Sequence, residues 1–193
     1  RWSYQQKNNM LAAVNDFYEA SNFHDWFVST QSEQQQAIAS FKQVCSLDYT
    51  WFDSYYGKND KLSSRIILSF MIGNSNNGIS LKRKDGTLLL TPVLGSLSQN
   101  NGSVRFNGDM NLIVHEFSHP YCNPLIEDNW SAISEKAEKV YRGVKSAMEN
   151  QDYGNPITMM CETLVRASAV RYMISHNQKD LVDQRLSEEE GNG

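Results

Sequence analysis

The segment His-Glu-Phe-Ser-His at residues 115–119 restricts the fold of this sequence more than any other feature. It follows the apolar residues 112–114 and Asp109, a residue type that commonly caps helices, so an apolar helix is predicted here. Because an α-helix has about 3.6 residues per turn, residues i and i+4 lie on the same face. Both imidazoles of this HExxH motif can therefore reach one zinc ion, and Glu116 can accept a proton from a zinc-bound water beside them.

A catalytic zinc site on His115 and His119 needs a third protein ligand and an open position for water. The sequence lacks the HExxHxxGxxH extension that supplies a third histidine in some zinc enzymes, so another segment must provide the ligand. Glu162 is the best candidate, because residues 158–170 predict a helix that is apolar on nearly every face. A carboxylate in such a helix is costly unless it binds a metal or pairs with a cation.

Other interpretations of these residues are open at this point. Glu162 can form an ion pair with Arg166 at i+4, either as its whole function or in addition to binding a metal. Cys122 follows the motif closely and Cys161 adjoins Glu162, so a closed structural zinc site with two histidines and two cysteines also fits. That arrangement leaves Glu116 without a function. The alternatives to an enzyme are therefore a structural zinc protein and a metal-free helical interaction domain.

Polar side chains near the proposed ligands are candidates for supporting functions in catalysis. A peptidase needs a hydrogen-bond donor for the oxyanion, and four side chains qualify: Tyr121, Tyr153, Arg166 and Tyr172. We favour Tyr153, which lies just before the predicted Glu162 helix, although packing or helix capping explains it equally well. Asn111 and Asn123 lie one helical turn from the histidines and are candidates for orienting them, with loop or capping functions as the alternative.

The complete chain, residues 1–193, is predicted to form one α+β domain. Residues 1–57 contain apolar residues at helical spacing and aromatic clusters, and we expect these helices to pack on a common core. Residues 109–193 predict the HExxH helix, a long amphipathic helix, and a further helix that begins at Asn155-Pro156. Since Pro120 has no backbone N–H, we expect the HExxH helix to end or kink there, which would place its second histidine at the mouth of a cleft.

Residues 58–108 predict a small, mainly antiparallel sheet. Apolar segments bounded by Asn and Gly clusters predict the strands of a meander: 65–72, 79–83 and 87–94. Pro92 should confine its strand to a sheet edge or end it early, because proline cannot donate to a neighbouring strand. An Asn/Gly-rich loop at residues 98–108 is expected to close this region.

The composition excludes several classes of protein. The formal net charge is −4 and no basic run is longer than residues 82–84, which argues against nucleic acid as a partner. No apolar stretch approaches the roughly 20 residues that span a bilayer, so no membrane span is expected. Three cysteines cannot all pair within the chain, which argues against a disulfide-stapled scaffold.

With HExxH on one helix and a candidate glutamate ligand on a later helix, the sequence resembles the gluzincin class of zinc metallopeptidases. More closely, His-Glu-Phe-Ser-His-Pro-Tyr-Cys-Asn-Pro-Leu followed by Glu-Thr-Leu-Val-Arg-Ala resembles a bacterial family of unknown function, presumed to be exported metallopeptidases. The similarity covers about residues 114–172. Thermolysin-like gluzincins carry an acidic residue four positions after the ligand glutamate, whereas Arg166 stands there in this sequence.

The resemblance implies a zincin-like fold with Zn²⁺ on His115, His119 and Glu162, and with Glu116 as general base. The expected activity is hydrolysis of a peptide bond in a peptide or protein substrate. Zinc would polarise the scissile carbonyl, and Glu116 would pass a proton from water to the leaving amine. The strands that flank Gly78 can pair with an extended substrate. The resemblance also implies a periplasmic, cell-surface or secreted location.

Overall fold

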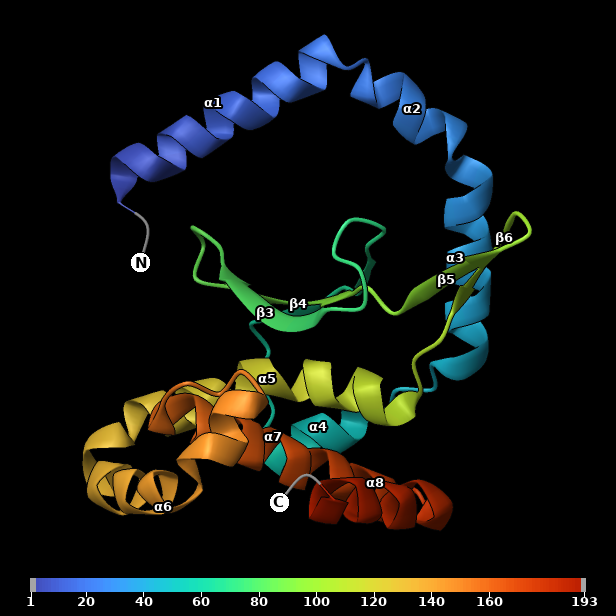
Figure 1. The fold of residues 1–193 in the computed structure, drawn as a ribbon. Helices are drawn as coiled ribbons and strands as arrows, with labels where there is room; N and C mark the ends of the chain where they lie inside the picture. The colour runs from blue at the N-terminus through green and yellow to red at the C-terminus, as the bar shows by residue number, and fades with distance from the viewer. Residues whose placement is uncertain (1–2, 192–193) are drawn as a thin grey trace.

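The computed structural model describes residues 3–191 and has the predicted α+β fold (Figure 1). Within these residues the helices are α1 (Tyr4–Ala20), α2 (Phe23–Ser29), α3 (Gln31–Val44), α4 (Tyr49–Tyr56), α5 (Met110–Asp128), α6 (Trp130–Asn150), α7 (Pro156–Ser175) and α8 (Lys179–Gly191). The strands are β1 (Leu62–Ser64), β2 (Ile67–Leu68), β3 (Asn76–Lys82), β4 (Leu88–Leu94), β5 (Leu97–Asn100) and β6 (Ser103–Phe106). In this part of the chain, no helix has the length and apolar character needed to cross a membrane.

The main sheet is organised around β4, its most deeply buried strand. β3 pairs with β4 in antiparallel orientation from Asn76 opposite Leu94 to Lys82 opposite Leu88, whereas β1 and β2 pair with the other side of β4 in parallel. The expected antiparallel meander is therefore wrong for the segment 65–72, of which only β2 forms a strand and pairs in parallel, and β1 lies before the predicted segment. The expectation that Pro92 lies at an edge or ends its strand is wrong as well. β4 takes the centre because its leucines have the most apolar surface to bury.

Pro92 fits inside the central strand because one neighbouring strand is interrupted beside it. On one side it lies opposite Gly78 of β3. On the other side it follows Leu90, the last residue paired with β1, and precedes Val93, the first residue paired with β2. The proline therefore falls in the gap between two short strands, where no neighbouring residue has to accept a hydrogen bond from its nitrogen.

Strands β5 and β6 form a β-hairpin in place of the loop expected at residues 98–108. Its two-residue turn consists of Asn101 and Gly102, whose φ angles are 49° and 79°. Asparagine and glycine adopt such positive φ angles most readily, so the turn matches its sequence. The strands themselves are short, and α3 supports them: Gln36 Oε1 accepts a hydrogen bond from the Val104 N–H at 2.9 Å. The sequence pattern does not contain this tertiary contact.

Helix α5 lies at the centre of the fold, between the sheet and the helices α4 and α7 (Figure 1). One face of α5 belongs to the hydrophobic core through Ile113, Val114 and Phe117, which are almost completely buried. Phe52 of α4 packs on this face, with its ring centroid 4.9 Å from that of Phe117. The expected packing of the aromatic cluster at residues 51–56 on the core is therefore confirmed.

The N-terminal helices α1 and α2 form where helices are predicted, but the expectation that they pack on the core is wrong. No side chain of α1 is buried, and Leu11 and Phe17 are 63% and 56% exposed. The two helices form an arm that curves around the sheet (Figure 1). Their aromatic rings pack on one another, with Phe23 5.7 Å from Phe17 and 5.2 Å from Trp26. Helical periodicity identifies an apolar face and does not specify what covers it.

Helix α5 continues through Pro120 to Asp128 and does not end at this proline. His119 therefore lies inside the helix and not at its C-terminus. Pro120 leaves the carbonyl of Glu116 without its usual intrahelical partner. Strand β3 packs against that carbonyl so closely that a Cβ on Gly78 would lie 2.1 Å from its oxygen. Tertiary packing against β3 and α7 thus maintains the helix across the proline.

Gly78 and Gly143 offer a matched test of this close approach. We expect Gly78→Ala to lower the free energy of unfolding by about 1–3 kcal/mol, because the added methyl group overlaps the Glu116 carbonyl. Gly143→Ala lies in α6 with no atom within 4 Å of the added group, and should raise the free energy of unfolding by about 0.5–1 kcal/mol. Urea unfolding followed by circular dichroism measures both changes. Equal stability of Gly78→Ala and the wild type would contradict the contact.

Candidate metal centre

Helix α5 directs His115 and His119 toward α7 and places Glu116 beside them, next to Gly78 of β3. Its N-terminus is capped as predicted, with Asp109 Oδ1 accepting a hydrogen bond from the Leu112 N–H at 2.8 Å. The imidazole rings of the two histidines are one helical turn apart, and their centroids are separated by 4.9 Å. The helix therefore presents both rings to the same neighbouring element.

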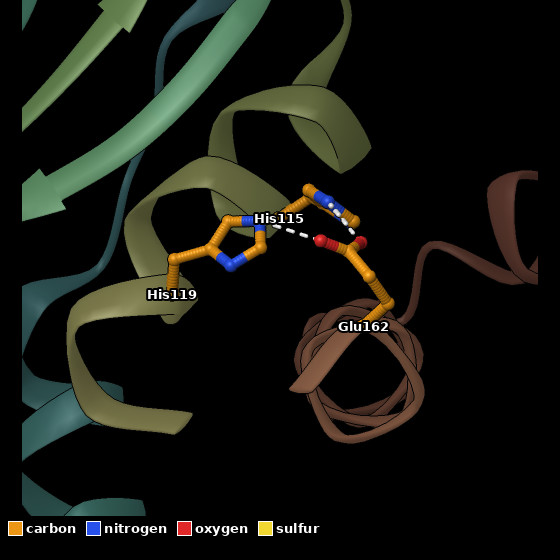
Figure 2. Close-up of side chains that lie close together, drawn as sticks. All are labelled: His115, His119 and Glu162. Atoms are coloured by element: carbon orange, nitrogen blue, oxygen red, sulfur yellow. Dashed lines mark ion pairs between the residues drawn. The ribbon is translucent and has the colours of Figure 1, made fainter. Parts of the chain in front are cut away.

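Glu162 on α7 completes a group of three potential metal ligands, His115, His119 and Glu162, which together form the metal group (Figure 2). α7 begins as predicted after Asn155, whose Oδ1 accepts a hydrogen bond from the Thr158 N–H at 2.9 Å. Glu162 Oε2 lies 3.4 Å from Nε2 of His115, and Oε1 lies 3.6 Å from Nε2 of His119. One carboxylate from α7 thus faces both imidazoles of α5.

The spacing of these donor atoms suits a single metal ion. One nitrogen or oxygen atom from each residue lies within 4.8 Å of the other two. Ligands about 2.0–2.1 Å from a tetrahedral zinc ion lie roughly 3.3–3.4 Å from one another, close to the carboxylate–imidazole distances found here. The three side chains are 12–15% exposed. A cleft of about 420 Å³ opens beside His115 and Glu116, so solvent can reach an ion held by this group.

Glu116 lies beside the three potential ligands without belonging to the group. Its side chain is only 7% exposed, and its Oε2 lies 3.9 Å from Nε2 of His119. Within residues 3–191 this oxygen has no hydrogen-bond partner. Burial raises the pKa of Glu116 to about 7; the charge of Glu162 acts in the same direction, and His115 opposes it. A buried carboxyl group with an available oxygen and a pKa near neutrality is suited to accept and return a proton.

The two asparagines considered as partners of the histidines have different surroundings. Asn123 Oδ1 lies 3.3 Å from Nδ1 of His119, so it can orient this imidazole while Nε2 faces Glu162. Burial lowers the pKa of His119, which favours the neutral imidazole that a metal ion requires. Asn111 lines the cleft, and its buried Oδ1 has no hydrogen-bond partner among the described residues. Of the two, Asn123 is the one that contacts a potential ligand.

Tyr153 and Arg166 lie on the wall of the cleft next to Glu162. The Tyr153 hydroxyl is 3.4 Å from Glu162 Oε2 and accepts a hydrogen bond from Nη2 of Arg166 at 2.7 Å. Burial raises the pKa of the Tyr153 phenol, and the charge of Glu162 acts in the same direction. The phenol is therefore protonated at neutral pH, and its O–H can act as a donor at the edge of the metal group.

The other two candidate oxyanion donors lie elsewhere. Tyr172 is completely buried, and its hydroxyl accepts a hydrogen bond from the backbone N–H of Asp48 at 2.7 Å. Tyr121 stacks on Tyr56, with ring centroids 4.6 Å apart, and lines a different cavity. Both side chains are part of the core packing and do not face the metal group.

The alternative pairings of the site residues are not formed in the described part of the chain. Arg166 makes its ion pair with Glu189 of α8 and not with Glu162. Cys122 and Cys161 are free thiols, and neither belongs to the ligand group. A closed site of two histidines and two cysteines is therefore not assembled.

Sequence reasoning missed the residues that surround Arg166. Gln151, just after α6, accepts a hydrogen bond from Nη2 of Arg166 at 3.1 Å, and α8 contributes Glu189 and Arg185. The sequence of α8 is highly charged, which is typical of a solvent-exposed helix. Nothing in its spacing indicates a contact with the helices that carry the histidines and Glu162.

Residues 4–193 match the family model described as Domain of unknown function (DUF4932), and the chain belongs to this family. No curated protein and no solved structure shows significant similarity to the chain. The family assignment agrees with the resemblance to a family of unknown function and does not itself supply an activity. The group of His115, His119 and Glu162 is therefore the observation from which a function has to be inferred.

Removal of Glu162 tests the metal centre directly. We expect the wild-type protein to bind about one divalent metal ion per chain, and Glu162→Ala to weaken binding at least about 100-fold because a ligand is lost. Glu135→Ala, which changes an exposed glutamate of α6, is the matched control and should bind like the wild type. Elemental analysis and competition with a chromophoric chelator measure binding. Metal that survives Glu162→Ala but is lost on joint replacement of Cys122 and Cys161 would contradict this centre.

Proposed function

We propose that this protein is a zinc metallopeptidase that hydrolyses peptide bonds. The observation that carries the proposal is the position of Glu116 directly beside the group of His115, His119 and Glu162. Its buried Oε2 has no hydrogen-bond partner among the described residues. A purely structural metal site does not require such a carboxyl group, whereas metal-assisted hydrolysis requires a base for the attacking water. The adjacent cleft offers space for a substrate.

Zinc is the metal that the donor set suits best. Two imidazoles and one carboxylate form a common ligand set of catalytic zinc, in which the fourth position is left open. Structural zinc sites are closed by four protein ligands and usually include cysteines. The ligand group within residues 3–191 has three members and no cysteine. A zinc ion bound there would act as a Lewis acid that polarises the scissile carbonyl and lowers the pKa of water.

Glu116 performs the proton transfers of the proposed reaction. Its carboxylate accepts a proton from the attacking water, and the resulting carboxyl group gives this proton to the nitrogen of the leaving amine. Tyr153 stabilises the negative charge that develops on the carbonyl oxygen. Its hydroxyl accepts a hydrogen bond from Arg166 and donates one to Glu162 Oε2 at 3.4 Å, so its O–H would turn from this carboxylate to the oxyanion. Arg166 adds a positive charge behind the phenol.

An extended substrate is expected to bind along β3. This strand pairs with β4 on one side, and its other edge has no partner strand in the described chain. Gly78 of β3 lies against helix α5, since an added Cβ would be 2.1 Å from the Glu116 carbonyl oxygen and 2.6 Å from Cβ of His119. A peptide that adds to this edge by main-chain hydrogen bonds would therefore pass close to the metal group.

Glu116→Gln separates catalysis from metal binding. We expect this change to lower kcat for peptide hydrolysis about 10²–10⁴-fold, because glutamine cannot accept the proton, while the metal content stays at the wild-type level. Glu127→Gln, which changes an exposed glutamate on the same helix, is the control and should keep full activity. Initial rates of the zinc-loaded proteins on a quenched fluorescent peptide library give the comparison. Failure of the zinc-loaded wild type to cleave any peptide, or wild-type rates for Glu116→Gln, would show that the proposal is wrong.

A further inference from the structure

A series of polar contacts connects the C-terminal helix α8 to the metal group, and Arg166 lies at its middle. Nη1 of Arg166 forms an ion pair with Glu189 of α8. Nη2 donates hydrogen bonds to the Tyr153 hydroxyl at 2.7 Å and to Gln151 Oε1 at 3.1 Å. The Tyr153 hydroxyl in turn lies 3.4 Å from Glu162 Oε2. A residue near the end of the described chain is thus linked to a potential metal ligand.

We propose that Glu189 is a positioning residue for the metal centre and acts through Arg166. This inference rests on the proposed function, because the orientation of Arg166 affects catalysis only if Tyr153 and Glu162 take part in it. The carboxylate of Glu189 contacts the guanidinium groups of Arg166 and Arg185 and is not a member of the ligand group. Its function is to determine the direction in which Arg166 points.

Arg166 has a competing partner on its own helix. Glu162 and Arg166 are four residues apart, the spacing at which opposite charges on a helix form ion pairs. In the structure the guanidinium is directed instead to Glu189 of α8. A direct Arg166–Glu162 pair would occupy a carboxylate oxygen that now faces the histidines, and would therefore compete with the metal ion. Glu189 prevents this competition by holding the guanidinium away from Glu162.

Further polar contacts restrain both members of the Glu189–Arg166 ion pair. The two side chains are 25% and 20% exposed, so water screens their attraction less than it screens a pair on the surface. Oε1 of Glu189 lies 2.5 Å from Nη2 of Arg185, one turn earlier on α8. Because the planar guanidinium of Arg166 is bound through both terminal nitrogens, it cannot rotate freely. The hydrogen bond from Arg166 to the Tyr153 hydroxyl therefore keeps a fixed orientation.

Glu189→Gln tests the proposal, with Glu190→Gln as the matched control. Glu190 is the adjacent exposed glutamate and forms no ion pair among the described residues. With cobalt as a spectroscopic probe in place of zinc, we expect Glu189→Gln to change the visible absorption of the bound ion and to weaken cobalt binding about tenfold. With zinc, kcat for peptide cleavage should fall about tenfold, while KM changes less than about twofold. Glu190→Gln should match the wild type in every measurement.

A double-mutant cycle with Arg166→Met separates positioning from a general effect on folding. If Glu189 acts through Arg166, adding Glu189→Gln to Arg166→Met changes cobalt affinity less than about twofold. An equal effect of Glu189→Gln in both backgrounds would overturn the proposal. A spectrum and an affinity unchanged from the wild type would overturn it as well. Unfolding of α8 would reduce affinity in both backgrounds, so this outcome also counts against positioning.

The cobalt measurements distinguish failure of this inference from failure of the proposed function, because they do not depend on peptide cleavage. A wild-type protein that binds cobalt but cleaves no peptide overturns the proposed function, and the spectra of Glu189→Gln then still decide the positioning role. A wild-type protein that binds no cobalt overturns both the metal centre and the role of Glu189.

Discussion

The packing of α5 against α7 is the interaction on which the rest of the structure depends. It brings the Glu162 carboxylate within 3.4–3.6 Å of two imidazoles that come from a different segment of the chain. Burial of any of these polar groups alone is unfavourable, and a shared cation would offset much of that cost. Apolar side chains of both helices, including Val114 and Tyr172, belong to the same hydrophobic core. The contact that stabilises the fold therefore also assembles the metal group.

Helix α5 divides its surface between packing and chemistry. The face of α5 in the hydrophobic core carries Val114 and Phe117. The face toward α7 carries the two histidines, and His115 and Glu116 line the cleft. The lack of a side chain at Gly78 lets β3 approach the same helix closely. The proposed base and the potential ligands consequently lie close to β3, whose second edge has no partner strand within residues 3–191. This convergence is what the proposed hydrolysis of an extended peptide requires.

Much of the fold could be predicted from the sequence, and the errors have a common physical origin. The helices of the metal group and the α+β class follow from periodicity and capping residues. Pro92 and Pro120 were each expected to interrupt an element because each lacks a backbone N–H. The structure accommodates both: β1 and β2 are separated beside Pro92, and β3 packs against the carbonyl that Pro120 leaves unpaired. α1 shows the opposite error, since its amphipathic pattern predicted a helix but not its exposure.

The sequence by itself determined the features that depend on contacts within a turn or two of helix. These are the shared face of His115 and His119, the position of Glu116 beside them, and the helix caps at Asp109 and Asn155. Only the tertiary structure decided that Glu162, and neither cysteine, joins the histidines, and that Arg166 pairs with α8 in place of Glu162. An ion pair at i+4 was equally compatible with the local sequence. The choice between these partners depends on which distant side chains the packing of α5, α7 and α8 brings within reach.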